Sequence, residues 1–218
     1  MLFDSSGNPY FEVISEGEAK ITATLNGVEA VGSFTANSLG EFATAPNPTL
    51  PQDQVISIFS DSYTGVSNLN FAAFNDPNVV ISAPVANGNQ YVSYENLNFV
   101  GLGWDGTVDA AQMTHLHLDV QLKSSGDQNF IVELIDFGGN NQNDGLPGTD
   151  DTAGGYLVPS NQLVKDTWVS VDIPLSAFTR PTGGGGAGNP NTSNIGLVGF
   201  VSTSFGSFLI DNVYFYRQ

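Results

Sequence analysis

The chain has 218 residues, of which 40% are hydrophobic and 11% aromatic, which is enough apolar material for a sizeable core. Only 12% of the residues are charged, yet acidic residues outnumber lysine plus arginine by 22 to 5, and the net charge is −17. Because so few basic residues cannot follow a phosphate backbone or an anionic bilayer surface, we expect neither nucleic acid nor membrane insertion, and neutral ligands suit this chain better. The absence of cysteine excludes disulfides, cysteine-ligated zinc and a thiol nucleophile.

Residues 1–44 carry a hairpin pattern. Apolar and polar residues alternate over 20–25 and again over 28–34, and Asn26-Gly27 between them is a strong signal for a two-residue hairpin turn. The segment GEAKITAT at 17–24 is similar to the last strands of bacterial immunoglobulin-like repeats. A complete domain of that kind takes about 100 residues, so the resemblance implies an incomplete Ig-like fragment at 1–44. The pattern leaves open whether the fragment packs on the rest of the chain or stays mobile.

The next segment, 45–51, contains Pro46, Pro48 and Pro51, which favour an extended linker over a helix or an interior strand. Residues 52–218 then alternate between short strand-like runs and turn-rich stretches, and we find no convincing helical periodicity. The clearest strand predictions are 78–82, 90–99, 114–122, 129–136, 156–158, 168–173, 195–202 and 208–216. This pattern predicts an all-β chain: a β-sandwich of jelly-roll type at 52–218, preceded by an N-terminal β-hairpin fragment.

Two predicted strands near the end of the chain are especially regular. In TWVSVDIPLSAF at 167–178, Val169, Val171 and Ile173 alternate with Ser170 and Asp172. In FLIDNVYFYRQ at 208–218, strict alternation places Leu209, Val213 and Phe215 on one face and Phe208, Ile210, Tyr214 and Tyr216 on the other. Asp211 interrupts this apolar strand, so its carboxylate requires a partner, commonly a cation.

These two segments, together with MTHLHLDV at 113–120 and VELIDFGG at 132–139 followed by DDT at 150–152, resemble the C-terminal β-sandwich carbohydrate-binding modules of laminarinases, agarases and related polysaccharide-degrading enzymes of marine Bacteroidetes. The resemblance covers about 55–217. It implies a secreted or cell-surface protein whose partner is a neutral polysaccharide, with β-1,3-glucan the first choice and agarose or another glucan or galactan the second. It further implies a monomeric, non-catalytic module that tethers neighbouring domains of a longer chain to their substrate.

Two other functions remain open: a structural spacer or adhesin domain, and a glycan-degrading enzyme. Glycoside hydrolysis usually requires two carboxylates that flank the scissile bond. From Pro46 onward the chain has only two glutamates, Glu95 and Glu133, and each stands alone in a predicted strand. We therefore expect no catalytic residues and no enzyme activity in this module.

His115 and His117 share a predicted strand face with Asp119, opposite the apolar residues of the same strand. Two histidines and an aspartate can ligate a transition metal. A polar groove face that hydrogen-bonds sugar hydroxyls is the stronger prediction for this strand.

A calcium ion is the preferred cofactor hypothesis, because acidic, glycine-rich turns supply the oxygen ligands that a hard cation binds. One candidate site joins Asp61, in an early turn, to Asp211 on the last strand. The other is the loop DFGGNNQNDGLPGTDDTAGG, which offers Asp136, Asn140, Asp144, Asp150 and Asp151. The sequence does not distinguish between these sites.

Aromatic side chains are the expected sugar platforms, because the C–H face of a pyranose packs on a π-face while polar neighbours bind its hydroxyls. Trp104 follows a glycine-rich bend and precedes Asp105, so we expect this pair to contact the ligand. Tyr91 and Tyr94 lie on opposite faces of one predicted strand, so at most one of them faces a ligand. Trp168 is expected to pack in the core. If Trp104 were the core residue instead, the ligand face would lie around His115 and His117.

Overall fold

The computed structural model describes residues 2–3, 9–10, 17–22, 24–29, 31–38, 43–125 and 128–218. The chain divides into two compact units, Met1–Ala43 and Thr44–Gln218, which we call the N-terminal unit and the module. Among the described residues, no helix is both long and apolar enough to cross a membrane.

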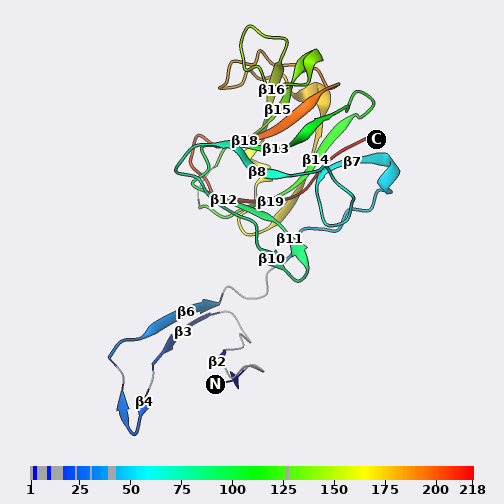
Figure 1. Cartoon of the computed structure of the whole chain (residues 1–218). Helices are drawn as coiled ribbons and strands as arrows, with labels where there is room; N and C mark the ends of the chain where they lie inside the picture. The colour runs from blue at the N-terminus through cyan, green and yellow to red at the C-terminus, as the bar shows by residue number, and fades with distance from the viewer. Residues whose placement is uncertain are drawn as a thin grey trace. The chain divides into compact units, whose positions relative to one another are not determined.

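The N-terminal unit consists of short antiparallel strand pairs (Figure 1). These are β1 (Leu2–Phe3) with β2 (Pro9–Tyr10), β3 (Gly17–Ile21) with β6 (Phe34–Ser38), and β4 (Thr24–Leu25) with β5 (Val28–Glu29). Asn26 and Gly27 connect β4 to β5 with φ angles of 52° and 79°, the left-handed values that a two-residue hairpin turn requires. The predicted N-terminal hairpin is therefore confirmed, although Ala23 and Ala30 of the predicted alternation lie outside the described residues.

The module is a sandwich of two antiparallel sheets, which confirms the predicted all-β class (Figure 1). The six-stranded sheet has the order β17 (Trp168–Pro174), β14 (His115–Leu122), β19 (Phe208–Tyr216), β12 (Val92–Glu95), β9 (Val80–Ser82), and β7 (Val55–Phe59) also pairs with β19. The five-stranded sheet has the order β16 (Thr152–Val158), β15 (Phe130–Asp136), β18 (Ile195–Val201), β13 (Phe99–Val108), β8 (Asn70–Asn75).

Short elements complete the module. A small hairpin pairs β10 (Val85–Ala86) with β11 (Asn89–Gln90). Four 3₁₀ turns are η1 (Gln52–Gln54), η2 (Gly138–Asn140), η3 (Ser160–Gln162) and η4 (Leu175–Ala177).

The core lies between the two sheets and follows the two-residue period of the strands. In β14, Leu116, Leu118 and Val120 are fully buried, and the alternate residues of β15, from Phe130 to Leu134, meet them from the other sheet. The residues that alternate with these core-facing positions point to the outer faces of the two sheets.

Strand β19 does not alternate as the sequence predicted. Its pairing with β14 shifts between His117 and Asp119, and Asn212 has a φ of 50°, so the strand carries an extra residue there. Phe208 and Ile210 therefore lie in the core with Val213 and Phe215, while Tyr214 and Tyr216 lie on the outer face beside the histidines. The bulge converts a strand that reads as apolar on both faces into one with an aromatic outer face.

The proline-rich segment belongs to the module rather than separating it from the N-terminal unit. Ala45 is 4% exposed, Asn212 Nδ2 donates to the carbonyl oxygen of Pro46 at 3.0 Å, and the Tyr63 hydroxyl donates to that of Leu50 at 2.9 Å. The segment is extended, as predicted, and these contacts hold it on the module.

Candidate functional site

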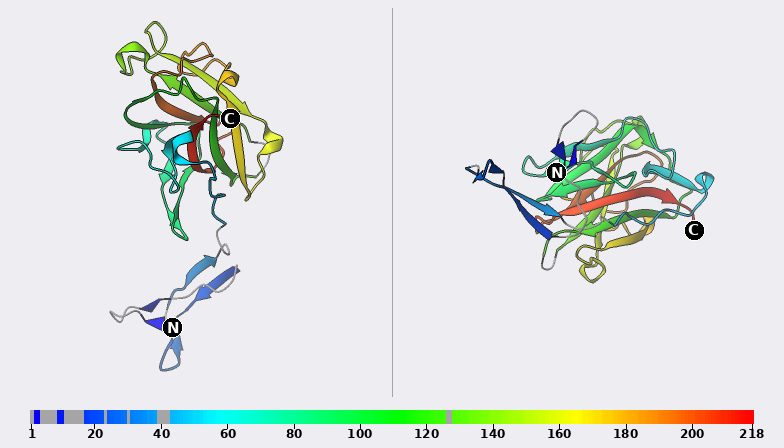
Figure 2. Two further views of the ribbon diagram at one scale, coloured as in Figure 1. Left: turned by 90° about the vertical axis from the view of Figure 1, so that its right-hand side faces the viewer. Right: turned by 90° about the horizontal axis from the view of Figure 1, so that it is seen from below.

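The outer face of the six-stranded sheet gathers most of the polar aromatic groups of the module. The left view of Figure 2 shows four strands of this sheet side by side: β7 in cyan, β19 in red, β14 in green and β17 in yellow. We call this surface the polar face, and it comprises Trp168, Ser170 and Asp172 of β17, His115, His117, Asp119 and Gln121 of β14, Asp211, Asn212, Tyr214 and Tyr216 of β19, and the adjoining Tyr63 and Tyr91.

Strand register aligns these side chains in rows. His117 stands opposite Asp172 on one side and Tyr214 on the other, and Asp119 stands opposite Ser170 and Asp211. Directly opposed residues in antiparallel strands have neighbouring Cβ atoms, so each row is a set of interacting side chains. The sequence had predicted this face for His115 and His117, and that prediction agrees with their position.

Each histidine of β14 stacks on a tyrosine of β19. The rings of His117 and Tyr214 are 4.5 Å apart with an interplanar angle of 19°, and those of His115 and Tyr216 are 5.2 Å apart at 25°. Tyr63 meets Tyr214 edge-on at 5.4 Å. His115, Tyr216 and Tyr63 are partly exposed, whereas His117 and Tyr214 are buried.

His117 is the cationic centre of the polar face. Its Nδ1 lies 2.8 Å from Asp172 Oδ1, and its Nε2 lies 3.6 Å from Asp119 Oδ1. Burial disfavours the imidazolium, but the hydrogen bonds and charges of Asp119 and Asp172 outweigh that effect and raise the His117 pKa to about 9. The hydrogen bond from His117 in turn lowers the Asp172 pKa. At neutral pH this site therefore holds an imidazolium between two carboxylates.

The two aspartates in the middle of the face are almost completely buried. Asp119 accepts hydrogen bonds from Ser170 Oγ at 2.5 Å and from Asn212 Nδ2 at 2.8 Å. Asp211 accepts from Asn89 Nδ2 at 2.8 Å and from the backbone N–H of Asn212 at 2.7 Å. Burial, with the nearby charges of Asp119 and Asp61 adding to it, raises the Asp211 pKa to about 6.

Trp168 and Tyr91 form a second aromatic group on the same face. Their rings meet edge-on at 6.3 Å, and both side chains are partly exposed. Trp168 stands opposite Gln121, which is 4% exposed and whose Oε1 has no hydrogen-bond partner among the described residues. The prediction that Trp168 packs in the core is wrong, because Trp168 shares the outer face with Ser170 and Asp172 while Val171 and Ile173 face inward.

Trp104 and Tyr94 are buried, although both were predicted as ligand contacts. Trp104 is 9% exposed and belongs to the core cluster, and its Nε1 has no hydrogen-bond partner within the described part of the chain. Tyr94 is fully buried, its hydroxyl donates to the carbonyl oxygen of Phe71 at 2.9 Å, and burial raises its pKa. The predictions of an exposed Trp104 platform and of a ligand contact from Tyr94 are wrong, because both side chains point between the sheets.

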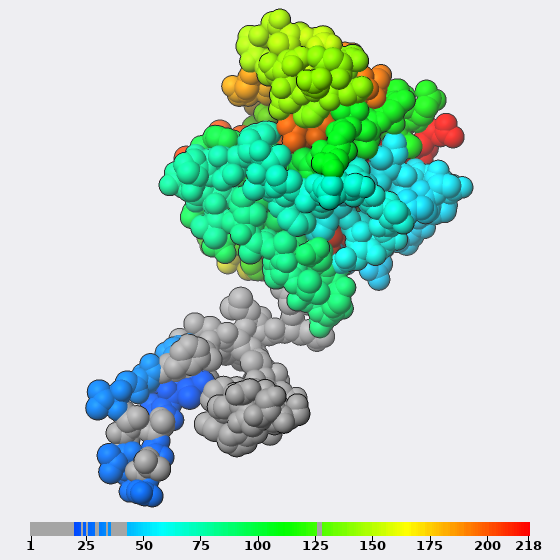
Figure 3. Space-filling model, viewed as in Figure 1, coloured from blue at the N-terminus to red at the C-terminus, as the bar shows by residue number. Residues whose placement is uncertain are grey.

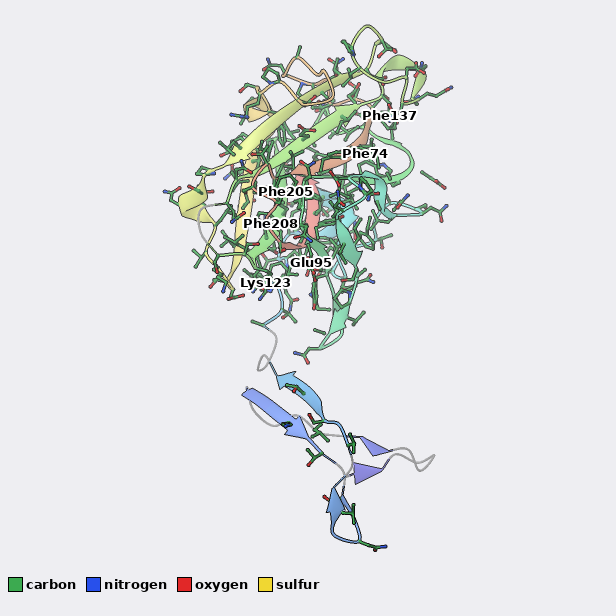
Figure 4. The ribbon with its side chains drawn as sticks, turned by 90° about the vertical axis from the view of Figure 1, so that its left-hand side faces the viewer. Phe74, Glu95, Lys123, Phe137, Phe205 and Phe208 are labelled. Atoms are coloured by element: carbon green, nitrogen blue, oxygen red, sulfur yellow. The ribbon has the colours of Figure 1, made fainter. Side chains whose placement is uncertain are left out.

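Asp105 remains accessible, beside a shallow pocket of about 350 Å³ on the other side of the module. Figure 4 labels Phe74 and Phe137, two of the lining side chains. The other lining residues are Asn68, Asn70, Ala73, Gly103, Trp104, Asp105, Asn143, Gly196 and Leu197. Asn68 Nδ2 donates to Asp105 Oδ2 at 2.5 Å, so this carboxylate is already engaged. Trp104 and Asp105 thus both line one pocket, although Trp104 is largely buried.

The acidic residues named as calcium ligands separate into three groups. Asp61 accepts a hydrogen bond from the Gln90 backbone and influences Asp211 only through its charge. Asp136 is buried, and its two oxygens accept hydrogen bonds from the backbone N–H groups of Gly138 and Asn194. Asp144, Asp150 and Asp151 form the one group of three or more acidic or histidine side chains, among the described residues, whose donor atoms lie within 4.8 Å of one another.

The two glutamates of the module lie on different sheets. Glu95 is exposed on β12 of the six-stranded sheet, and Glu133 is on β15 of the five-stranded sheet. Burial raises the Glu133 pKa, against the opposing effect of a hydrogen bond from the Gly183 backbone. His115, His117 and Asp119 do not converge as metal ligands either, since His117 is bonded to Asp172 and His115 Nδ1 lies 2.8 Å from Thr114 Oγ1.

Most residues of the polar face were not predicted as ligand contacts from the sequence, and Tyr214, Tyr216 and Asp172 are three of them. Their signals were present: Asp172 alternates with Val171 and Ile173, and the two tyrosines have the i, i+2 spacing of one strand face. What was missing was the bulge at Asn212, which decides which face of β19 the tyrosines occupy.

No family model matches the chain, and no curated protein sequence matches it either. Among solved structures it is similar to a family 11 carbohydrate-binding module of the cellulosomal cellulase Lic26A-Cel5E of Clostridium thermocellum, at 17% identity and a TM-score of 0.51, covering 75% of this chain and 95% of that one. A family 30 carbohydrate-binding module matches at 16% identity and a TM-score of 0.50, covering 75% and 88%. An exo-β-agarase structure matches at 15% identity and a TM-score of 0.47, covering 75% and 25%.

These similarities show that the module has the β-sandwich fold of carbohydrate-binding modules, as the sequence resemblance implied. At such low identity they describe the fold alone. The marine Bacteroidetes origin and the Ig-like character of residues 1–44 stay predictions.

Proposed function

We propose that the polar face binds a neutral polysaccharide without cleaving it. The first-choice ligand is a β-1,3-glucan, and agarose or another glucan or galactan is the second. The observation that carries the proposal is the combination, on one sheet face, of partly exposed rings with oriented hydrogen-bonding groups: His115, Tyr216, Tyr63, Tyr91 and Trp168 beside Asp172 and Ser170.

A sugar requires both kinds of group. The C–H face of a pyranose packs on an aromatic ring, and carboxylates and hydroxyls bind the sugar hydroxyls at its rim. Asp172 accepts a hydrogen bond from the Tyr216 hydroxyl at 3.0 Å and from His117, which fixes its carboxylate while leaving the side chain exposed. Groups that are held in place before binding lose little conformational entropy when the ligand arrives.

The charge of the face supports a neutral ligand. Its one cationic group is His117, which is buried between Asp119 and Asp172 and already paired with them. A sulfated or uronic-acid polymer would find no unpaired cation among these side chains and would be repelled by a chain of net charge −17. The same pairing commits the carboxylates of Asp119 and Asp172 to His117, which supports binding over hydrolysis.

Binding of a polysaccharide by this module also implies a role for it within a longer chain. A module that holds its parent chain on a polysaccharide raises the effective concentration of substrate for any neighbouring catalytic domain. We accordingly propose a secreted or cell-surface location, a monomeric module and a parent enzyme that acts on the bound glycan.

Affinity electrophoresis and calorimetry of the full chain, with soluble β-1,3-glucan and with agarose oligosaccharides, test the proposal. We expect Trp168→Ala and Tyr216→Ala each to weaken binding by about 1 to 3 kcal/mol, the cost of losing an aromatic anchor. Phe205→Ala is the matched control, because Phe205 is 57% exposed and lies outside the polar face.

The outcomes separate the alternatives. Binding that survives both substitutions but is lost in Phe74→Ala would move the site to the pocket beside Asp105. An unmodified chain that binds none of the glycans would favour the spacer or adhesin function. Release of reducing sugar ends during incubation would instead establish a glycan-degrading enzyme.

A further inference from the structure

The loop between β15 and β16 gathers three carboxylates at one end of the module. Figure 3 shows it in yellow-green as a projecting cap. One oxygen from each of Asp144, Asp150 and Asp151 lies within 4.8 Å of the others. Asp144 and Asp150 are exposed, whereas Asp151 is 4% exposed at the base of the loop.

Asp151 has one engaged and one orphaned oxygen. Its Oδ2 accepts hydrogen bonds from the backbone N–H groups of Asp144 at 2.9 Å and Gly145 at 3.0 Å. Its Oδ1 is buried and has no hydrogen-bond partner among the described residues. A buried carboxylate oxygen without a donor is unfavourable, because the oxygen has lost its water and gained nothing in return. A bound cation would satisfy it.

The other two carboxylates are held beside Asp151 by the loop itself. Asp150 Oδ2 accepts the backbone N–H of Gly139 at 2.8 Å, and a Cβ atom at Gly138 would lie 2.4 Å from the Asp150 carboxylate. Asp144 Oδ2 accepts a hydrogen bond from Asn140 Nδ2 at 2.5 Å. Each of these carboxylates keeps its other oxygen for a ligand.

Among the described residues, no lysine or arginine forms an ion pair with these three carboxylates. The chain has five lysines and arginines in all, and within the described ranges their ion pairs reach only Asp166. Three carboxylates at this separation repel one another, and a divalent cation among them removes that repulsion.

We propose that this loop binds one calcium ion through Asp144, Asp150 and Asp151. The donors are all hard oxygens, with neither histidine nor cysteine in the group, which excludes the ligand sets of zinc and copper sites. Calcium accepts six to eight oxygens at about 2.3 to 2.6 Å in irregular geometry, so loop carbonyls and water can complete its shell. Magnesium requires a tighter and more regular octahedron, which an irregular loop suits less well.

The site would also order one wall of the Asp105 pocket. Asn143, which lines that pocket, immediately precedes Asp144, and Asn141 Oδ1 accepts a hydrogen bond from Thr107 Oγ1 of β13 at 3.0 Å. The calcium site is on a different part of the module from the polar face, so it stands independently of the glycan proposal.

Calorimetric titration of the full chain tests the proposal after dialysis against a chelator. We expect calcium chloride to bind at this loop, and magnesium chloride to bind at least tenfold more weakly. Asp144→Asn and Asp150→Asn, both at exposed positions, should each weaken calcium binding at least tenfold and abolish the calcium-induced rise in melting temperature. Asp61→Asn is the matched control and should change neither quantity.

Three outcomes would overturn the proposal. The first is a chain that binds no calcium. The second is magnesium binding as tightly as calcium. The third is calcium binding that is lost in Asp61→Asn but kept in Asp150→Asn, which would place the ion between the first and last strands instead.

Discussion

The outer face of the five-stranded sheet is rich in glycines and apolar side chains, with the phenylalanine rings of Phe74 and Phe99 and the carboxyl group of Glu133, whereas the polar face of the six-stranded sheet carries histidine, tyrosine and tryptophan rings, carboxylates and an imidazolium. On the five-stranded sheet Gly101 pairs with Gly199, and Gly199 and Gly155 both stand opposite Glu133. The Phe74 ring lies over Gly101 in the space that a Cβ would occupy. The inward-facing residues of both sheets are apolar and form the core. The two sheets therefore differ in their outward-facing residues.

The two tryptophans express this difference most directly. Trp104, on the five-stranded sheet, is buried, and Trp168, on the six-stranded sheet, is partly exposed. We expect Trp104→Ala to lower the free energy of unfolding by about 3 to 5 kcal/mol, because it leaves a large cavity. Trp168→Ala should cost far less stability. Urea denaturation of both variants measures this, and a larger loss for Trp168→Ala would reverse the comparison.

The polar face should give the module a stability that depends on pH. His117 has a folded pKa of about 9 against 6.5 for an unperturbed histidine, so its contribution is complete below 6.5 and lost as pH rises through 9. The full change is on the order of 3 kcal/mol. The pKa of Asp172 is lowered, so this group titrates below the window, and Asp211, with a pKa of about 6, titrates at its lower edge.

Thermal melts between pH 6.5 and 9.5 measure this decline in stability. His117→Gln is the control and should flatten the profile. A slope that persists in that variant would show that another group is responsible.

The proline-rich segment contacts the polar face. A truncation that removes this segment should therefore be less stable than one that keeps it. Deleting residues 1–43 leaves the bonds to Pro46 and Leu50 intact, and we expect the melting temperature of the module to stay unchanged. Deleting 1–51 removes both bonds and the buried Ala45, and should cost about 1 to 3 kcal/mol. Equal stability of the two truncations would mean that this segment contributes nothing to the face.

The smallest effect is expected on the five-stranded sheet. Gly101→Ala places a methyl group where the Phe74 ring lies, at 2.3 Å from Cε1. Because Phe74 is 39% exposed and can turn outward, we expect a loss of only about 1 kcal/mol. The double variant Gly101→Ala, Phe74→Ala should recover part of it, and a double-mutant cycle measures the coupling. Strictly additive losses would show that Phe74 does not cover Gly101.

The strands themselves could be predicted because their signal is local. Val169, Val171 and Ile173 alternate with Ser170 and Asp172, and the structure gives each the predicted side of β17. Asn26-Gly27 likewise specifies its own turn, since the left-handed backbone is available to these two residues. The same two-residue period predicted that His115 and His117 share one face of their strand.

The candidate site could be predicted only in part, because a two-residue period shows which residues share a face and not which face is covered. The glycine-rich bend around Trp104 favoured exposure and the alternating strand at Trp168 favoured burial, but only the packing of the two sheets decides that Trp104 is the buried one. In the same way, the six acidic residues considered for calcium are equivalent until the loop folds and brings three of them together.

The sequence by itself determined an all-β module, most of its strands and the shared face of His115 and His117, because alternation and turn residues act over a few positions. Only the tertiary structure decided the site around them. The bulge at Asn212 turns Tyr214 and Tyr216 onto the polar face, and strand pairing sets Asp172 against His117 although 55 positions separate them. Such contacts depend on register between distant strands, and a shift of one residue in that register exchanges the two faces of a strand.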